Sequence, residues 1–348
     1  MATFTASSAV DMRLLSAQGL FDYLDSTFSS TLIHVFDDAT HFVDFSGTGF
    51  AANPLTGAIT GGTLTGINYV EGTPVMQITG ASMPAVDFYN FAVANQSQAA
   101  LSALFSGNDV FTGSSGNDAL LSFAGNDTLS GGAGLDTLVG GAGNDVYMFT
   151  AGDTLTEAVG EGSDTVRSAS AFTLKANFEN LTLGGGANIA GTGNTVANKL
   201  IGNTGNNLLK GLGGRDVLTG NGGNDTLDGG AGNDILIGSG GADTFSFSTA
   251  LTNNVDTVRD FAVGVDKLRL DDDIFTTLTG GAPLSGAFVS GIDIKSAQDS
   301  DDRIAYDTST GKLYYDADGF GGNDAVQFAV LGSTTHPALT STDFVIVT

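Results

Sequence analysis

The sequence predicts an all-β repeat fold in which short strands stack into a parallel β-roll, and three observations support it. Aspartates recur every nine residues in two runs, a glycine stands two positions before each of them, and an apolar or aromatic residue stands two positions after. A unit this short holds one turn and one short strand. Because one unit cannot bury its apolar side chain alone, neighbouring units must stack. The aspartates are Asp109, Asp118, Asp127, Asp136 and Asp145 in the first run, and Asp216, Asp225, Asp234 and Asp243 in the second.

The repeat also predicts bound calcium. Its best copies read Gly-Gly-Ala-Gly-Leu-Asp-Thr-Leu-Val at residues 131–139 and Gly-Gly-Ala-Gly-Asn-Asp-Ile-Leu-Ile at 229–237, and both match the nonapeptide G-G-x-G-x-D-x-U-x. Glycines let the loop backbone turn its carbonyls inward, and each aspartate adds a carboxylate. Calcium takes six to eight oxygens of these kinds. Besides the nine aspartates, the candidate ligands are Asn207, Gly131, Gly132, Ala133, Gly134, Gly229 and Ala231.

These motifs resemble the RTX family of calcium-dependent, right-handed parallel β-rolls. The resemblance implies that a full coil takes two nonapeptides, so that unit n stacks on unit n+2 with calcium held between position-six aspartates and loop carbonyls. Asn198 and Asn207 lead the second run in the same register and should bind more weakly, because an amide oxygen carries no charge. The implied pairs are Asp109 with Asp127, Asp127 with Asp145, Asp118 with Asp136, Asp216 with Asp234, Asp225 with Asp243, Asn198 with Asp216, and Asn207 with Asp225.

Charge and composition limit the kinds of molecule that the chain can bind. The chain has 38 acidic and 12 basic residues, a net charge of −26, which bound calcium would offset and which makes nucleic acid an unsuitable partner. Cysteine is absent, and no apolar run approaches the roughly 18 residues of a membrane span.

The N-terminus lacks the features of a Sec-type signal peptide. The sequence Asp-Phe-Val-Ile-Val-Thr at residues 343–348 resembles the C-terminus of serralysin-type exported proteins, which implies recognition by type I secretion machinery and a secreted or cell-surface location. The same segment also reads as an ordinary final β-strand.

The period divides the chain into five expected segments. These are residues 1–103, an N-terminal cap of short helices and β-coils; 104–148, the first calcium array; 149–201, a β-helical spacer; 202–248, the second array; and 249–348, a β-rich C-terminal cap with the export signal.

Elements outside the arrays are predicted from local patterns. Apolar spacing favours helices over residues 8–28 and 84–105, the latter with Ser82 as its N-cap. Residues 31–80 are rich in β-forming residues and turn glycines, so we expect strands that could form further coils without calcium. Residues 306–315 predict a hairpin with its turn at 307–311.

The sequence contains no H-E-x-x-H or G-x-S-x-G motif, and we assign no catalytic residues. A cluster from His34 to Asp44 could bind a transition metal, or could be a polar turn between strands. Asp316, Asp318 and Asp324 resemble a calcium loop, with an acidic hairpin turn as the alternative. Two functions stay open. One is an exported adhesion, scaffold or interaction module with a cell-surface, polysaccharide or host partner; the other is a polysaccharide-acting enzyme with its chemistry in residues 1–100.

Overall fold

The computed structural model describes residues 3–6, 25–28, 32–38, 41–52, 59–71, 73–84, 97–321, 325–332 and 335–348. The chain divides into two compact units, residues 1–166 and 167–348, and strand β13 (Thr165–Ser168) crosses the division. Each unit is described by itself.

The first unit begins with an antiparallel sheet, in which each strand pairs with the next along the chain. Strands were expected over residues 31–80 and are confirmed, but the suggestion that they form coils is wrong. Connections of a few residues join adjacent strands only in antiparallel order, whereas a parallel neighbour needs a long crossover. The strands are β2 (Asp25–Phe28), β3 (Leu32–Asp38), β4 (His41–Ala52), β5 (Ile59–Glu71) and β6 (Thr73–Pro84).

One short strand joins this sheet to the roll. Strand β1 (Thr3–Ala6) pairs antiparallel with β6 and parallel with β7 (Val110–Thr112), the first strand of the first array. The edge of the roll is therefore covered by chain from the N-terminus, which removes unpaired backbone groups that would otherwise invite association.

Helix α2 (Ser97–Leu104) precedes the first array and lies within the helix expected over residues 84–105. The expected start is wrong, because Ser82 and Pro84 belong to strand β6; residues 85–96 lie outside the described part. The buried ring of Phe105 follows the helix and lies 4.9 Å from the ring of Phe111, centroid to centroid. The other expected helix ends in strand β2, and its residues 8–24 lie outside the described part.

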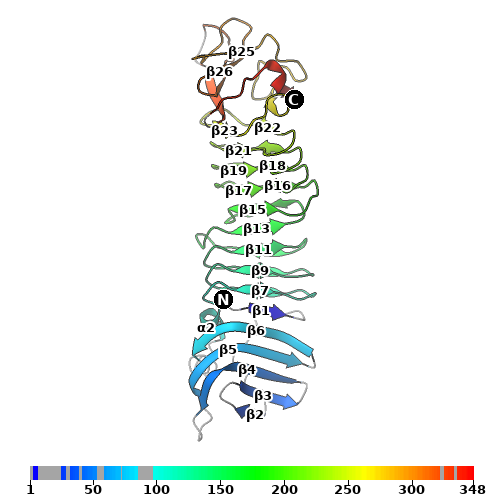
Figure 1. The fold of residues 1–348 in the computed structure, drawn as a ribbon, viewed down its shortest axis with the longest axis vertical. Helices are drawn as coiled ribbons and strands as arrows, with labels where there is room; N and C mark the ends of the chain where they lie inside the picture. Colours follow the sequence, from blue (N-terminus) through cyan, green and yellow to red (C-terminus); the bar gives the residue numbers. More distant parts are fainter. Residues whose placement is uncertain are drawn as a thin grey trace. The chain divides into compact units, whose positions relative to one another are not determined.

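The first array forms two parallel sheets, one on each face of the roll (Figure 1). Each strand pairs with the strand two units away, as in Val110 with Thr128 and Thr137 with Ala119, which confirms the predicted n to n+2 stacking. One face holds β7, β9 (Thr128–Ser130) and β11 (Val146–Phe149); the other holds β8 (Ala119–Leu121), β10 (Thr137–Val139) and β12 (Thr154–Thr156).

The second unit repeats this two-sheet arrangement, and its coils before residue 202 stack in register on the second array. One face holds β15 (Asn180–Leu183), β17 (Lys199–Ile201), β19 (Val217–Thr219), β21 (Ile235–Ile237), β23 (Asp256–Val258) and β28 (Val326–Leu331). The other holds β14 (Phe172–Thr173), β16 (Ala190–Thr192), β18 (Leu208–Lys210), β20 (Thr226–Asp228), β22 (Thr244–Phe247), β24 (Lys267–Asp271) and β29 (Phe344–Val347).

The C-terminal region closes the roll of the second unit. Strands β26 (Ile304–Asp307) and β27 (Lys312–Tyr315) form the antiparallel hairpin predicted at residues 306–315. Strand β25 (Phe288–Gly291) pairs with β26, and a short 3-10 turn (Ser341–Asp343) leads into β29. The final segment is therefore a strand of the roll, as the alternative interpretation of residues 343–348 predicted, and a role in export stays a prediction.

A column of apolar side chains forms the core of each array. The residues two positions after the nine aspartates are all fully buried, as predicted, and a single such side chain fills each half-coil. Burial of one leucine contributes about 1.5–3 kcal/mol. These residues are Phe111, Leu120, Leu129, Leu138, Tyr147, Leu218, Leu227, Leu236 and Phe245.

Two adjacent leucines in β18 test this account. Leu209 is 0% exposed in the column, whereas Leu208 is 40% exposed on the outer face. We expect Leu209→Ala to lower the free energy of unfolding by about 2–5 kcal/mol, because it leaves a cavity between stacked coils. Leu208→Ala should cost about 1 kcal/mol or less. Urea unfolding at saturating calcium measures both, and equal losses would contradict the one-column core.

Candidate metal centre

Each repeat aspartate after the first on either side of the array ties its loop to the loop one coil earlier. One carboxylate oxygen of Asp127 accepts the backbone N–H of Asp109 at 2.7 Å, and Asp145 accepts that of Asp127 at 2.7 Å. The loops therefore stack through a continuous ladder of aspartates, in the predicted pairing. The remaining rungs join Asp118 to Asp136 at 2.8 Å, Asn198 to Asp216 at 2.7 Å, Asp216 to Asp234 at 2.7 Å, Asn207 to Asp225 at 2.7 Å and Asp225 to Asp243 at 2.9 Å.

The second oxygen of these carboxylates is buried and lacks a hydrogen-bond partner among the described residues. This holds for Oδ2 of Asp127, Asp136, Asp145, Asp216, Asp225 and Asp234. A buried carboxylate oxygen without a partner is costly, because water no longer solvates its charge. A cation between successive loops would satisfy these atoms, so the residues present fit calcium.

Burial also shifts the protonation equilibria. It raises the pKa of Asp127 and Asp145 to about 6 and that of Asp216 to about 7, against the backbone hydrogen bonds, which lower them. Neighbouring carboxylates add to the rise, as Asp109 does for Asp127. These are the shifts expected where anions gather without a counter-charge, and a bound divalent cation would reverse them.

The loop glycines make room for this arrangement. A side chain at Gly131 would collide with the carboxylate of Asp136 on the same loop, and a side chain at Gly229 would collide with that of Asp234. Gly132 and Gly134 have φ of +94° and +131°, a region that side-chain-bearing residues rarely adopt.

The two predicted alanine ligands sit beside these glycines in different loops. Ala133 lies between β9 and β10, in the same loop as Gly132 and Gly134. Ala231 lies between β20 and β21. The carbonyl of Ala231 accepts the N–H of Gly214 at 3.0 Å and so takes part in stacking. Coordination of calcium by the loop carbonyls stays a prediction.

The ladders run further than the nine-residue period. Asp153, Asp164, Asp256 and Asp266 each accept the backbone N–H of the last repeat aspartate on their side. Sequence reasoning missed these four because the steps lengthen or shorten; their partners are Asp136 at 3.2 Å, Asp145 at 2.8 Å, Asp234 at 3.0 Å and Asp243 at 2.9 Å respectively. A signal was present, since each is followed two positions later by leucine or valine, as in the repeats.

A second ladder, of asparagines, runs beside the aspartates. The side-chain oxygen of Asn108 accepts the N–H of Asn126 at 2.8 Å, and Asn126 accepts that of Asn144 at 2.7 Å. These bonds run from the later loop to the earlier one, opposite to the aspartate bonds. Successive loops are thus joined by reciprocal bonds, and the asparagines that precede aspartates such as Asp109 and Asp127, which sequence reasoning passed over, have a stacking role.

Asparagine replaces aspartate at the start of the second array, at Asn198 and Asn207, and its side chain makes uncharged bonds to the coil before. The side-chain N–H groups of Asn207 donate to the carbonyl of Ile189 at 3.1 Å and to Oδ1 of Asn203 at 3.1 Å. Those of Asn198 donate to the carbonyls of Phe178 and Glu179. The amide nitrogen already satisfies the surrounding oxygens, so Asn207 has less need of a cation than the aspartates have.

Other asparagines bridge the coils that precede the second array. The side-chain amide of Asn194 donates to the carbonyls of Lys175 at 2.9 Å and Phe178 at 2.8 Å. Asn203 makes the matching pair of bonds to the carbonyls at 184 and 187, both at 3.0 Å. One uncharged side chain thus joins two carbonyls of the earlier loop in each case.

The other candidates from the sequence do not form a described site. His34 faces Asp44 across the hairpin of β3 and β4, but the side chains of the cluster from His34 to Asp44 lie outside the described part. Asp316 accepts the N–H of Ala297 at 3.0 Å and that of Gly319 at 3.1 Å, so it orders a turn, and Asp324 is not described.

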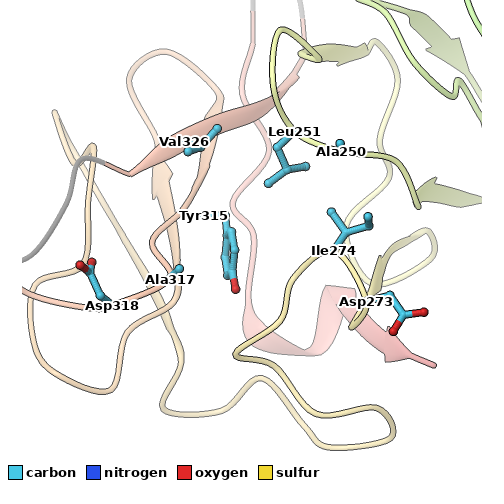
Figure 2. A pocket seen from close by; sticks show the side chains of 8 residues that line it. All are labelled: Ala250, Leu251, Asp273, Ile274, Tyr315, Ala317, Asp318 and Val326. Carbon is cyan, nitrogen blue, oxygen red and sulfur yellow. The ribbon is translucent and has the colours of Figure 1, made fainter.

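A hollow of about 480 Å³ lies in the C-terminal region of the second unit. Figure 2 shows Leu251, Ile274 and Tyr315 around it, with the carboxylates of Asp273 and Asp318 on opposite sides. The hydroxyl of Tyr315 accepts the N–H of Thr277 at 3.0 Å. The lining is mainly apolar and brings together no acid, base and nucleophile in the arrangement that catalysis needs.

Comparison with known proteins agrees with the ladder geometry. A model of the RTX calcium-binding nonapeptide repeat matches four copies, at residues 106–122, 121–155, 192–227 and 219–247. The chain carries calcium-binding RTX repeats. Their two groups cover the nine repeat aspartates, and the aspartate ladders of both arrays are consistent with several calcium ions.

Among solved structures, the crystal structure of the extracellular lipase LipA from Serratia marcescens is similar, with 21% identity and a TM-score of 0.26. The match covers 69% of this chain but only 38% of that lipase. No curated protein matches the sequence. Among the described residues, no helix has the length and apolar character to cross a membrane.

The ladder predicts unequal effects of two matched substitutions. Asp127 stands between Asp109 and Asp145, whereas Asp109 is the first aspartate of its ladder. Asp127→Asn keeps the acceptor oxygen and removes the charge, and we expect it to abolish binding of about two calcium ions, against about one for Asp109→Asn. Calorimetric titration measures the stoichiometry, with exposed Asp273→Asn as the control. Equal losses at positions 109 and 127 would argue against shared sites.

Proposed function

We propose that this chain is an exported protein that folds on binding calcium outside the cell and then serves as an adhesion, scaffold or interaction module. The observation that carries the proposal is the stack of buried aspartates whose second oxygen has no partner among the described residues. Such a stack needs cations, and calcium accepts the carboxylate and carbonyl oxygens that the loops offer.

The proposed calcium ligands are the carboxylates of the aspartate ladders in both arrays. They comprise the nine repeat aspartates and, by continuation of the same hydrogen-bond pattern, Asp153, Asp164, Asp256 and Asp266. Asn207 is a weaker candidate ligand, because its amide oxygen carries no charge and already accepts the N–H of Asn203 at 2.8 Å. The calcium-dependent segments are then the two arrays at residues 104–148 and 202–248 together with the coils that carry these four added aspartates. The remaining residues form the cap, the spacer and the closing region.

Electrostatics couples calcium to folding. At a net charge of −26, the chain resists compaction, and each coil that forms brings further carboxylates together. Because the paired loops exist only in the folded state, the free energy of calcium binding becomes free energy of folding.

Export is supported by the repeat class. RTX repeats are typical of extracellular proteins that leave the cell by type I secretion. Low calcium inside the cell would keep the chain unfolded for passage, and higher calcium outside would fold it. A rigid, acidic roll without a described catalytic arrangement suits an interaction role at the surface or in the matrix.

Calcium should drive folding in vitro. After chelation, far-ultraviolet circular dichroism should show a largely unfolded chain, and added calcium should raise the β-type signal cooperatively. Magnesium should substitute poorly, because it requires tight octahedral geometry and retains its waters. A cooperatively folded state in excess chelator would overturn the proposal.

Export should depend on the C-terminal region. Deleting residues 299–348, by analogy with C-terminal addresses that a receptor reads, should leave the protein inside the producing cell. The double variant Asp127→Asn with Asp145→Asn retains this region and should still reach the medium although its folding by calcium is impaired. Immunoblots of medium and cells compare the two. Undiminished secretion of the truncated chain, or a cleaved N-terminus on the exported form, would contradict this.

A further inference from the structure

Three buried carboxylates meet where the first array ends. One oxygen from each of Asp145, Glu157 and Asp164 lies within 4.8 Å of the others. Their side chains are 0%, 7% and 1% exposed respectively, and Oδ2 of Asp145 has no hydrogen-bond partner among the described residues. Glu157 is not one of the repeat aspartates, and among the described residues this is the one group of three carboxylates placed closely enough to share a metal ion.

The register explains why a glutamate reaches it. Strands β10 and β12 pair with Val139 opposite Thr156, so the next residues, Gly140 and Glu157, occupy equivalent positions on successive coils. At Gly140 a side chain would collide with the carboxylate of Asp145. Glu157 stands one coil later and extends into this space beside Asp145. The first residue of a repeat such as Gly140 is glycine because a side chain there would collide with the aspartate. At the equivalent position one coil later the chain has Glu157 instead.

A tyrosine fixes the glutamate. Tyr147 takes the place that leucine has in neighbouring repeats, is 0% exposed, and donates its hydroxyl hydrogen bond to Oε1 of Glu157. The hydroxyl in turn accepts the N–H of Gly140 at 2.5 Å. This chain of bonds aligns Glu157 toward the two aspartates. Burial, together with the charges of Asp164 and Asp145, raises the pKa of Glu157 to about 8, a sign of excess negative charge.

We propose that Asp145, Glu157 and Asp164 form a calcium site of their own, with three carboxylates where the interior sites have two, and that this site has the highest affinity in the first array. The number of charged ligands is a main determinant of calcium affinity. The inference rests on the proposed calcium binding but adds a ligand that the repeat does not contain. Calcium held there fastens the coil at residues 154–164 onto the array, so that folding by calcium begins at its C-terminal end.

The test uses terbium, which replaces calcium and emits when a nearby tyrosine is excited. Tyr147 adjoins the site, so terbium bound there should produce tyrosine-sensitised emission at the lowest added concentrations. Glu157→Gln should remove this first phase or weaken it at least about tenfold. Glu161→Gln is the matched control: its Oε2 accepts the N–H of Ala158, and its charge acts on Asp145 and Glu157 although it is not one of the three clustered carboxylates. It should shift the phase by about twofold or less.

A second variant separates the site from its reporter. Tyr147→Phe keeps the packing and the three carboxylates, so the first phase of terbium emission should disappear while calorimetry still detects the high-affinity calcium site, weakened less than in Glu157→Gln. If Glu157→Gln and Glu161→Gln titrate alike while calcium still folds both, the inference fails and the proposed function stands. If calcium folds neither these variants nor the parent chain, the proposed function itself fails.

Discussion

The structure depends on one arrangement, the aspartate carboxylate placed between two successive coils. One oxygen accepts the backbone N–H of the coil before, and the other is left buried for a cation. A single apolar side chain per half-coil supplies too little burial to hold the stack against the repulsion of the carboxylates. We therefore expect stacking and ion binding to depend on each other.

Neutral coils in the second unit show how the same backbone stacks without this dependence. There Asn194 and Asn203 each bridge two carbonyls of the earlier loop through a side-chain amide. An amide group supplies two hydrogen-bond donors and no net charge. Because these bridges carry no charge, we expect the register of residues 172–201 to depend less on calcium than that of the arrays.

The period made the arrays predictable. A strict nine-residue step placed the buried column, including Leu218 and Phe245, because every unit meets the same neighbours. The pairing of Asp109 with Asp127 came from the resemblance to the RTX family. Where the step changes, pattern reasoning lost the ladder at Asp153 and Asp256, although the coils continue. Outside the arrays, residues 31–80 predicted strands correctly but not their antiparallel pairing, and Pro84 predicted a helix start where a strand ends.

By itself, then, the sequence determined the repeat fold, the buried apolar column and the calcium chemistry, because each follows from spacing and residue type within a short unit. Tertiary structure alone decided which side chains meet across coils of unequal length. Glu157 reaches Asp145 because β12 pairs with β10 and sets their loops in register, and Tyr147 orients it through a bond ten residues along the chain. Contacts between side chains of different coils depend on the number of residues in each loop between strands, which local sequence patterns do not specify.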